Sequence, residues 1–181
     1  MMNKFGLSLL TMFGIGHIKY APGTMASFIT CLIYYFLFSI DVNFYYFFLI
    51  FVILLIYSII LIDKLSHYFK EKDPKEIVID EFFGLSIPFV IVMFIYTMPL
   101  TEAWTRNLEF EVYYFFLFFI LFRFFDIYKP FPINIIDKKM KNGFGVMLDD
   151  IMAGVYTFIV FYIGVLFYIY SDFKWIIMQK K

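Results

Sequence analysis

Long hydrophobic runs separated by short polar segments make up most of the chain. Five runs are candidates for membrane-spanning helices, at residues 26–40, 44–62, 82–100, 110–122 and 151–170. A helix needs about twenty apolar residues to cross a bilayer, so the first and fourth runs are short, the fourth unless Phe124 and Phe125 extend it. The polar residues 41–43 between the first two runs predict a tight helical hairpin. The pattern therefore predicts an all-helical bundle of about five membrane spans.

Composition supports a membrane protein over a soluble domain. Of the 181 residues, 63% are hydrophobic and 25% aromatic, and the mean hydropathy is +0.83, far above the values of soluble domains. We expect a single integral membrane domain over residues 1–181, whose N-terminal segment is retained rather than cleaved as a signal peptide. Cys31 is the only cysteine and can form no internal disulfide.

The charged residues predict an orientation, although they balance to zero, with 15 basic and 15 acidic side chains. Basic residues stay on the cytoplasmic side of short loops. One side receives Lys4, Lys19, Lys64, Lys70, Lys72, Lys75, Arg123, Lys129, Lys138, Lys139 and Lys141. The other receives Arg106, Lys174, Lys180 and Lys181. The N-terminus is thus predicted on the cytoplasmic side of the membrane and the C-terminus on the opposite side, and no nucleic-acid partner is expected.

Two pairs of adjacent carboxylates precede apolar runs. Asp80 and Glu81 stand before the third run, and Asp149 and Asp150 stand before the fifth. One such pair is explained by helix capping or by the helix dipole. Two pairs at the edge of a low-dielectric region call for a cation, because unpartnered carboxylates are costly there. Oxygen ligands without a cysteine or histidine cluster favour Mg²⁺.

Basic residues follow the fourth run. Arg123 and Asp126 share a helix face if that helix continues past Phe122, which predicts an intrahelical ion pair. Lys129 precedes Pro130 and Pro132, which stop the helix. Arg123 and Lys129 fit two roles: anchors on the cytoplasmic side, or groups that neutralise a phosphate beside the carboxylates.

A glycine-containing segment, residues 14–27, precedes the first run. Gly23, Thr24 and Ser27 are candidate phosphate-binding residues through backbone amides and hydroxyls. The alternative is a turn at Pro22 and Gly23 followed by a helix N-cap at Thr24 or Ser27. The spacing and terminal lysine of a nucleotide P-loop are missing, which excludes that site.

Four unusual segments fall on the predicted cytoplasmic face and can converge into one site. They are GIGHIKYAPGTMAS (14–27), DPKEIVIDEFFG (73–84), RFFDIYKPFPI (123–133) and GFGVMLDDIMAG (143–154). Together, and in this order, they resemble the phosphatidylglycerophosphatase A family. One departure is Ala26, where the family commonly has glycine.

The resemblance implies a magnesium-dependent enzyme that hydrolyses phosphatidylglycerophosphate to phosphatidylglycerol and inorganic phosphate. It also implies a multi-pass protein of the bacterial cytoplasmic (inner) membrane whose active site faces the cytoplasm. The metal ligands would be Asp80, Glu81, Asp149 and Asp150, acting directly or through water. Arg123 and Lys129 would neutralise the phosphoryl oxygens, and Asp126 would hold Arg123 or join the metal ligands.

Several alternatives stay open at this point. Direct attack by water competes with an aspartyl-phosphate intermediate. The substrate can be a different lipid phosphate, because no residue is seen to read the glycerol head group. A small membrane transporter is the alternative outside the enzymes, but it predicts charges in the middle of spans. Metal count and oligomeric state do not follow from the sequence.

Overall fold

The computed structural model describes residues 4–40, 42–65, 76–98, 112–140 and 142–179, except for the side chains at 169 and 171–179. Regular structure in these ranges is helical throughout, which confirms the predicted fold class. The elements are α1 (Lys4–Leu10), the 3-10 helix η1 (Ile15–His17), α2 (Pro22–Ser39), α3 (Phe44–Leu65), α4 (Ile79–Tyr96), α6 (Val112–Tyr128), α7 (Ile133–Lys139) and α8 (Gly143–Gln179).

Four helices are long and apolar enough to cross a membrane: α2, α3, α4 and the Gly143–Tyr168 part of α8. The fourth predicted run forms α6, which does continue through Phe124 and Phe125 and ends at Tyr128. The prediction of about five spans therefore agrees with the structure. The connection between the first two runs is short, as predicted, since α2 ends at Ser39 and α3 begins at Phe44.

Two helix starts were predicted wrongly. Helix α2 begins at Pro22, four residues before the predicted run, because proline suits the first turn of a helix. Pro22 and Gly23 therefore belong to the helix and do not form a separate turn before it. Helix α8 begins at Gly143, eight residues before the predicted span, and the Asn142 side chain caps it by accepting a hydrogen bond from the Gly145 amide at 2.9 Å. Asp149 and Asp150 consequently lie inside a helix rather than in a loop before it.

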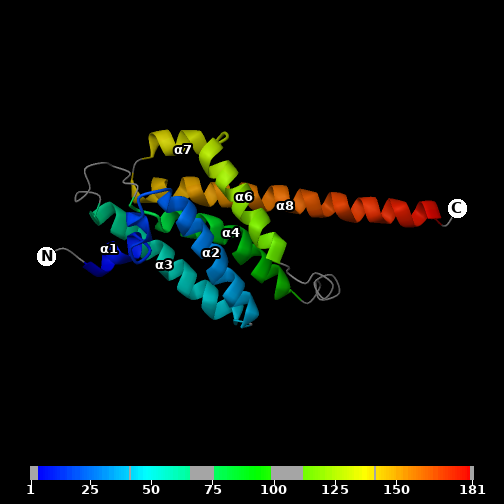
Figure 1. Ribbon diagram of the computed structural model, residues 1–181, viewed down its shortest axis with the longest axis horizontal. Helices are drawn as coiled ribbons and strands as arrows, with labels where there is room; N and C mark the ends of the chain where they lie inside the picture. The colour runs from blue at the N-terminus through cyan, green and yellow to red at the C-terminus, as the bar shows by residue number, and fades with distance from the viewer. Residues whose placement is uncertain (1–3, 41, 66–75, 99–111, 141, 180–181) are drawn as a thin grey trace.

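The alternating helix directions bring the predicted segments together. Helices α2, α4 and α8 start at one end of the bundle, and α3 and α6 finish there, with α7 beside them (Figure 1). From this end α8 extends past the other helices towards the C-terminus (Figure 1). We call this end, where α2, α4 and α8 begin, the polar end.

Helix α4 is the centre of the bundle, in contact with α2, α3, α6 and α8. Its inner side chains Phe83, Leu85 and Phe89 are almost completely buried. The ring of Phe89 stacks on that of Tyr34 from α2, with centroids 4.6 Å apart. Aromatic packing between helices thus forms the core on which the polar end is built.

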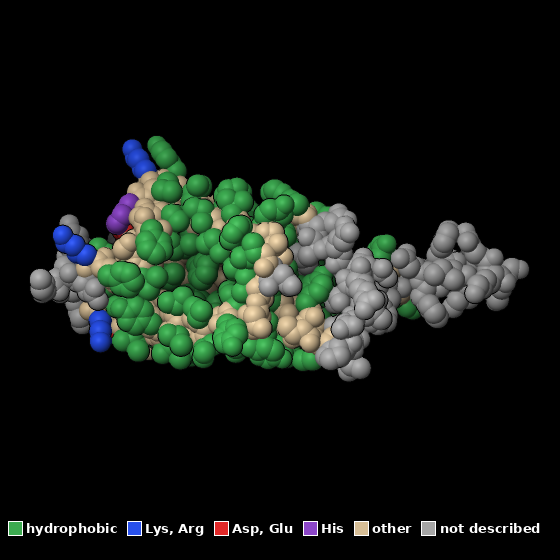
Figure 2. Space-filling view, turned by 90° about the horizontal axis from the view of Figure 1, so that it is seen from below, with side chains coloured by type: hydrophobic (Ala, Val, Ile, Leu, Met, Phe, Trp, Pro, Cys, Tyr) green, Lys and Arg blue, Asp and Glu red, His purple; other side chains and the backbone are tan. Residues whose placement is uncertain are grey.

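Hydrophobic side chains also cover the outside of the bundle. Figure 2 shows such a face, with basic side chains (blue) at one end. Leu49, Ile50 and Ile53 of α3 are each more than half exposed, as expected for a surface that meets lipid. Several residues of the predicted charge pattern lie outside the described parts: Lys70, Lys72, Lys75, Arg106, Lys141, Lys180, Lys181, Asp73 of the second segment, and the Lys174 side chain.

Candidate active site

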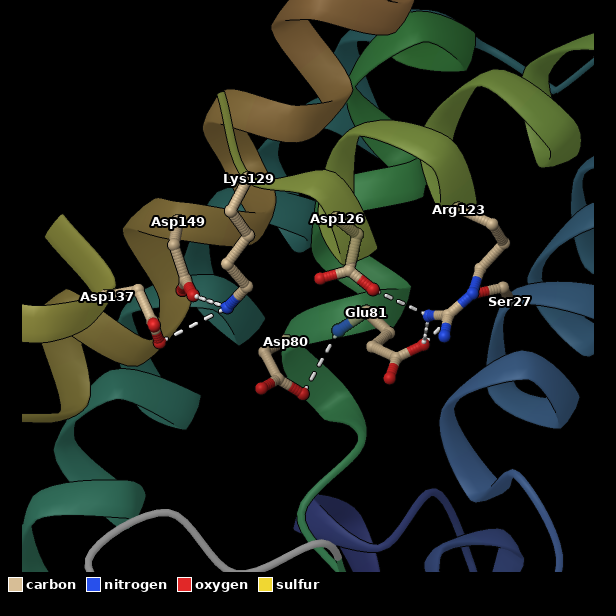
Figure 3. A network of polar contacts seen from close by, with 8 residues as sticks. All are labelled: Ser27, Asp80, Glu81, Arg123, Asp126, Lys129, Asp137 and Asp149. Atoms are coloured by element: carbon tan, nitrogen blue, oxygen red, sulfur yellow. Dashed lines mark hydrogen bonds and ion pairs between the residues drawn. The ribbon is translucent and has the colours of Figure 1, made fainter. Parts of the chain in front are cut away.

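The polar end collects the predicted site residues from four helices, and Figure 3 shows those that take part in its polar network. Helix α2 brings Gly23, Thr24 and Ser27, and the first turn of α4 brings Asp80 and Glu81. Arg123 and Asp126 come from the last turns of α6, with Lys129 just beyond it, and Asp149 and Asp150 come from α8.

Arg123 connects three helices. Its Nη1 donates to Oε2 of Glu81 at 2.7 Å and to Oδ2 of Asp126 at 2.8 Å. The Ser27 hydroxyl donates to the same Glu81 oxygen at 3.0 Å. The intrahelical pair predicted from the i, i+3 spacing is therefore present, and Arg123 also reaches across to α4. The buried Nε of Arg123 has no partner among the described residues. Both hydrogen bonds of the guanidinium use Nη1, which leaves Nη2 to donate to a ligand oxygen.

Lys129 forms a second cluster with two carboxylates. Its Nζ donates to Oδ2 of Asp149 at 2.6 Å and pairs with Oδ1 of Asp137 at 3.2 Å. Helix α6 ends just before Lys129, whose φ of 44° is left-handed, and Pro130 follows. Burial alone would lower the pKa of Lys129, but the hydrogen bonds and charges of Asp149 and Asp137 outweigh it and raise the pKa above its ordinary value of 10.5.

Asp137 was missed by the sequence analysis. It lies on α7, eight residues after Lys129, and sequence spacing gave no reason to bring it back to that lysine. Asp63 was also missed: its Oδ1 accepts the Gly143 amide at 2.6 Å and so holds the start of α8 against the end of α3. In the sequence, each of these two aspartates stands next to lysine residues near the end of a helix, and this is the feature that could have identified them.

Two buried carboxylates, Asp149 and Asp150, are not fully compensated, since Asp149 meets Lys129 through Oδ2 only. Asp150 is 5% exposed, and the negative charges of Asp126, Asp80, Asp149 and Glu81 all act on it. Oδ1 of Asp149 is buried without a hydrogen-bond partner among the described residues. Buried carboxylates in this situation are stabilised by a cation or by protonation.

The carboxylates suit a metal ion by chemistry but are not gathered around one point. Within the described ranges, no three aspartate, glutamate, histidine or cysteine side chains lie close enough together to hold a metal as they stand. Mg²⁺ binds through one or two carboxylates, several waters and the substrate's phosphate oxygens, so it does not need a complete protein cage. The all-oxygen donor set and the unpartnered Asp149 oxygen fit this mode.

Close backbone approaches hold the carboxylate-bearing helices in place. A Cβ at Gly23 would overlap the carboxylate of Glu81, and a Cβ at Gly84 would lie 2.6 Å from the backbone oxygen of Asp150. Gly23 therefore contacts the site through Glu81. Thr24 is half-buried in the first turn of α2, and its hydroxyl makes no hydrogen bond within the described part of the chain.

Comparison with known proteins assigns the family. The family model described as Phosphatidylglycerophosphatase A matches residues 8–165. The chain belongs to the phosphatidylglycerophosphatase A family. The predicted family is thereby confirmed, and it is a family of enzymes named for a phosphatase activity.

Individual relatives agree with the phosphatidylglycerophosphatase A assignment over different lengths. A phosphatidylglycerophosphatase A of Haemophilus influenzae is 62% identical over 42 residues, which is 23% of this chain and 26% of that protein. A phosphatidylglycerophosphatase A of Escherichia coli is 45% identical over 47 residues, 25% of this chain and 27% of that protein. The matches to these two relatives thus span only about a quarter of their length.

A third relative is similar over most of its length. It is a protein of Bacteroides thetaiotaomicron whose name proposes a phosphatidylinositol-3-phosphatase, and it is 34% identical over 152 residues, 82% of this chain and 86% of that protein. No solved structure matches the chain.

Proposed function

We propose that the protein is a magnesium-dependent lipid phosphatase that hydrolyses phosphatidylglycerophosphate to phosphatidylglycerol and inorganic phosphate. One observation carries the proposal: two cations, Arg123 and Lys129, stand among buried carboxylates at one end of a bundle of apolar helices. A phosphate ester on a lipid head group lies at the membrane surface while its acyl chains stay in the bilayer. Family membership supports the same activity.

Arg123 and Lys129 would bind the phosphoryl group. Guanidinium and ammonium donors make short, charge-assisted hydrogen bonds to phosphate oxygens. The Nη2 group of Arg123 offers such a bond without breaking the contacts of Nη1 to Glu81 and Asp126. Lys129 would exchange one of its two carboxylate partners for the substrate.

Asp80, Glu81, Asp149 and Asp150 would hold magnesium, directly or through water. Bound magnesium supplies positive charge at the phosphoryl oxygens. Its binding also relieves the repulsion that four carboxylates exert on Asp150.

Hydrolysis then needs a nucleophile and proton transfer. A water oriented by one carboxylate of the cluster bonds to phosphorus and passes its proton to that carboxylate, while the bond from phosphorus to the glycerol oxygen breaks. The leaving oxygen takes up a proton and departs as the alcohol. An aspartate of the same cluster is the competing nucleophile, through an aspartyl phosphate that water then hydrolyses.

A substrate panel tests the proposal. Purified protein in detergent micelles is given phosphatidylglycerophosphate, phosphatidylinositol 3-phosphate or phosphatidic acid, each with magnesium and with chelator, and phosphate release is measured. We expect magnesium-dependent release that is fastest from phosphatidylglycerophosphate. No release from any lipid by folded protein would overturn the proposal and favour the transporter alternative.

The Bacteroides relative supports a second candidate function. Similarity over 82% of this chain to a protein named for phosphatidylinositol 3-phosphate makes an inositol head group the specific rival. Faster release from that lipid than from phosphatidylglycerophosphate would establish the second function in place of the first.

A further inference from the structure

An apolar groove runs between α2 and α6, which lie side by side in Figure 1. It has a volume of about 260 Å³. Each helix contributes one face, with residues spaced i, i+3, i+4 and i+7: α2 from Phe28 to Tyr35 and α6 from Val112 to Phe119. Helical geometry makes such a face continuous along the helix.

The groove is closed below and open to the side. Its floor is formed by Cys31 and Phe115, which are 8% and 5% exposed. The rim side chains Leu32 and Phe116 are 52% and 56% exposed. A molecule dissolved in the bilayer can therefore enter from the membrane without crossing the bundle.

One end of the groove adjoins the proposed active site. Phe28 follows Ser27, which donates to Glu81, and Phe119 lies one helical turn before Arg123. From Phe28 to Tyr35 the groove extends about 10 Å along α2, at 1.5 Å per residue. This fits within one leaflet, whose hydrocarbon layer is roughly 15 Å deep.

We propose that this groove binds one acyl chain of the lipid phosphate substrate, an inference that rests on the function proposed above. The occupant should carry negative charge at one end and an apolar chain at the other, because the groove ends one helical turn from Arg123. A glycerophospholipid with a terminal phosphate has this character, and its chain would enter alongside Phe28 and Phe119 while its phosphate reaches Arg123.

The groove affects the position of the bound lipid more than the affinity of the protein for that lipid. Lipid tails are as apolar as the groove, so moving a chain from the bilayer into it gains little hydrophobic free energy. A chain held between α2 and α6 instead fixes the distance from the glycerol backbone to the phosphate. Small misplacements of reacting groups can lower rates by up to about 100-fold.

Cross-linking locates the chain directly. A phosphatidylglycerophosphate analogue with a diazirine in one acyl chain is irradiated with the full-length protein in micelles, and adducts are mapped by mass spectrometry. We expect adducts on residues 28–35 and 112–119. Adducts spread evenly over the exposed apolar side chains of α3 would overturn the proposal, because they would show contact by unbound lipid only.

A filled groove provides the kinetic test. Leu32→Trp places a large side chain in the groove, whereas Ile33→Trp adds the same side chain to the neighbouring position, which does not line it. We expect Leu32→Trp to reduce the ratio of long-chain to dioctanoyl substrate turnover roughly tenfold, with Ile33→Trp retaining the wild-type ratio. Equal ratios in all three proteins would contradict the proposal.

The two tests separate this inference from the function. Adducts in the groove without phosphate release by the wild type would support acyl-chain binding in the groove and overturn the proposed phosphatase activity. Phosphate release by the wild type, with no groove adducts and with the same long-chain to dioctanoyl turnover ratio in Leu32→Trp, would support the phosphatase and overturn the acyl-chain groove. A second copy of the chain in the groove would exclude the acyl chain, and it would appear as a disulfide-linked dimer of Leu32→Cys in a Cys31→Ser background.

Discussion

Arg123 is the residue on which the polar end depends most, because it joins α6 to α4 and, through Glu81, to Ser27 of α2. Lysine keeps the charge but has one nitrogen in place of the planar fork. We therefore predict that Arg123→Lys lowers kcat for phosphate release about 100-fold, the usual cost of removing one donor from a transition-state oxygen.

Lys139→Gln is the matched control for the loss of a basic contact. Lys139 is exposed at the end of α7, outside the network of Figure 3, so its replacement should leave kcat within about twofold of the wild type. Nearly full activity of Arg123→Lys would contradict a phosphate-binding role for the guanidinium.

The pair of Lys129 and Asp137 makes a prediction about pH. Because the pKa of Lys129 is raised, the stabilisation from its pairing is complete below pH 10.5 and is lost only as pH rises through the higher folded-state pKa. Asp137→Asn should thus weaken activity only a few-fold, since both side chains are 27% exposed. Its activity profile between pH 6 and about pH 10 should keep the wild-type shape; an alkaline limb that moves below pH 10 would show that Lys129 titrates there.

At the scale of elements, the contact between α4 and α8 sets the distance between the two carboxylate pairs. A Cβ at Gly154 would overlap the backbone oxygen of Gly84, so the helices approach through their glycines. We predict that Gly154→Leu lowers the free energy of unfolding by about 1–3 kcal/mol or more, the cost of overpacking. Thermal unfolding in detergent measures it.

Gly164→Leu on the same helix serves as the comparison. A Cβ there meets nothing within 4 Å, so leucine at this position should be neutral or slightly stabilising through its higher helix propensity. Equal unfolding midpoints for the two variants would show that α4 and α8 do not need the close approach.

The element boundaries show what sequence can and cannot predict. The apolar runs predicted the long helices and their order, because a membrane-spanning helix is a continuous stretch of hydrophobic residues in the sequence. The start of α8 could not be placed, since it depends on capping by Asn142 and on Asp63, which reaches Gly143 from 80 residues away. The Glu81–Arg123 pair, 42 residues apart, likewise depends on packing that no local pattern encodes.

At the scale of the whole molecule, the convergence of the four segments was predictable and their contacts were not. Successive membrane spans alternate in direction, so every second connection lies on the same side of the membrane. This rule alone predicted that one end of the bundle carries Ser27, Glu81, Arg123 and Asp149. Which cation meets which carboxylate follows from side-chain packing. Asp137 and the groove between α2 and α6 therefore emerged only from the structure.

The orientation of the bundle gives a further prediction. If the polar end faces the cytoplasm, then Lys139→Cys should react with a membrane-impermeant maleimide only after cells are permeabilised. Ile40→Cys, at the opposite end of α2, should react in intact cells. Both are made in a Cys31→Ser background. The reverse labelling pattern would place the polar end outside.

The central claim is that the carboxylates of the polar end hold magnesium for phosphate release. The most direct test measures how phosphate release depends on magnesium in the wild type, Asp150→Asn and Glu76→Gln. Glu76 is an exposed carboxylate before α4 and controls for the loss of one acid. We predict that wild type and Glu76→Gln release phosphate from phosphatidylglycerophosphate only with magnesium, and that magnesium raises their unfolding midpoints. Asp150→Asn should stay folded, lose at least about 100-fold in turnover, and show no such rise. Full magnesium-dependent turnover by Asp150→Asn would contradict the account.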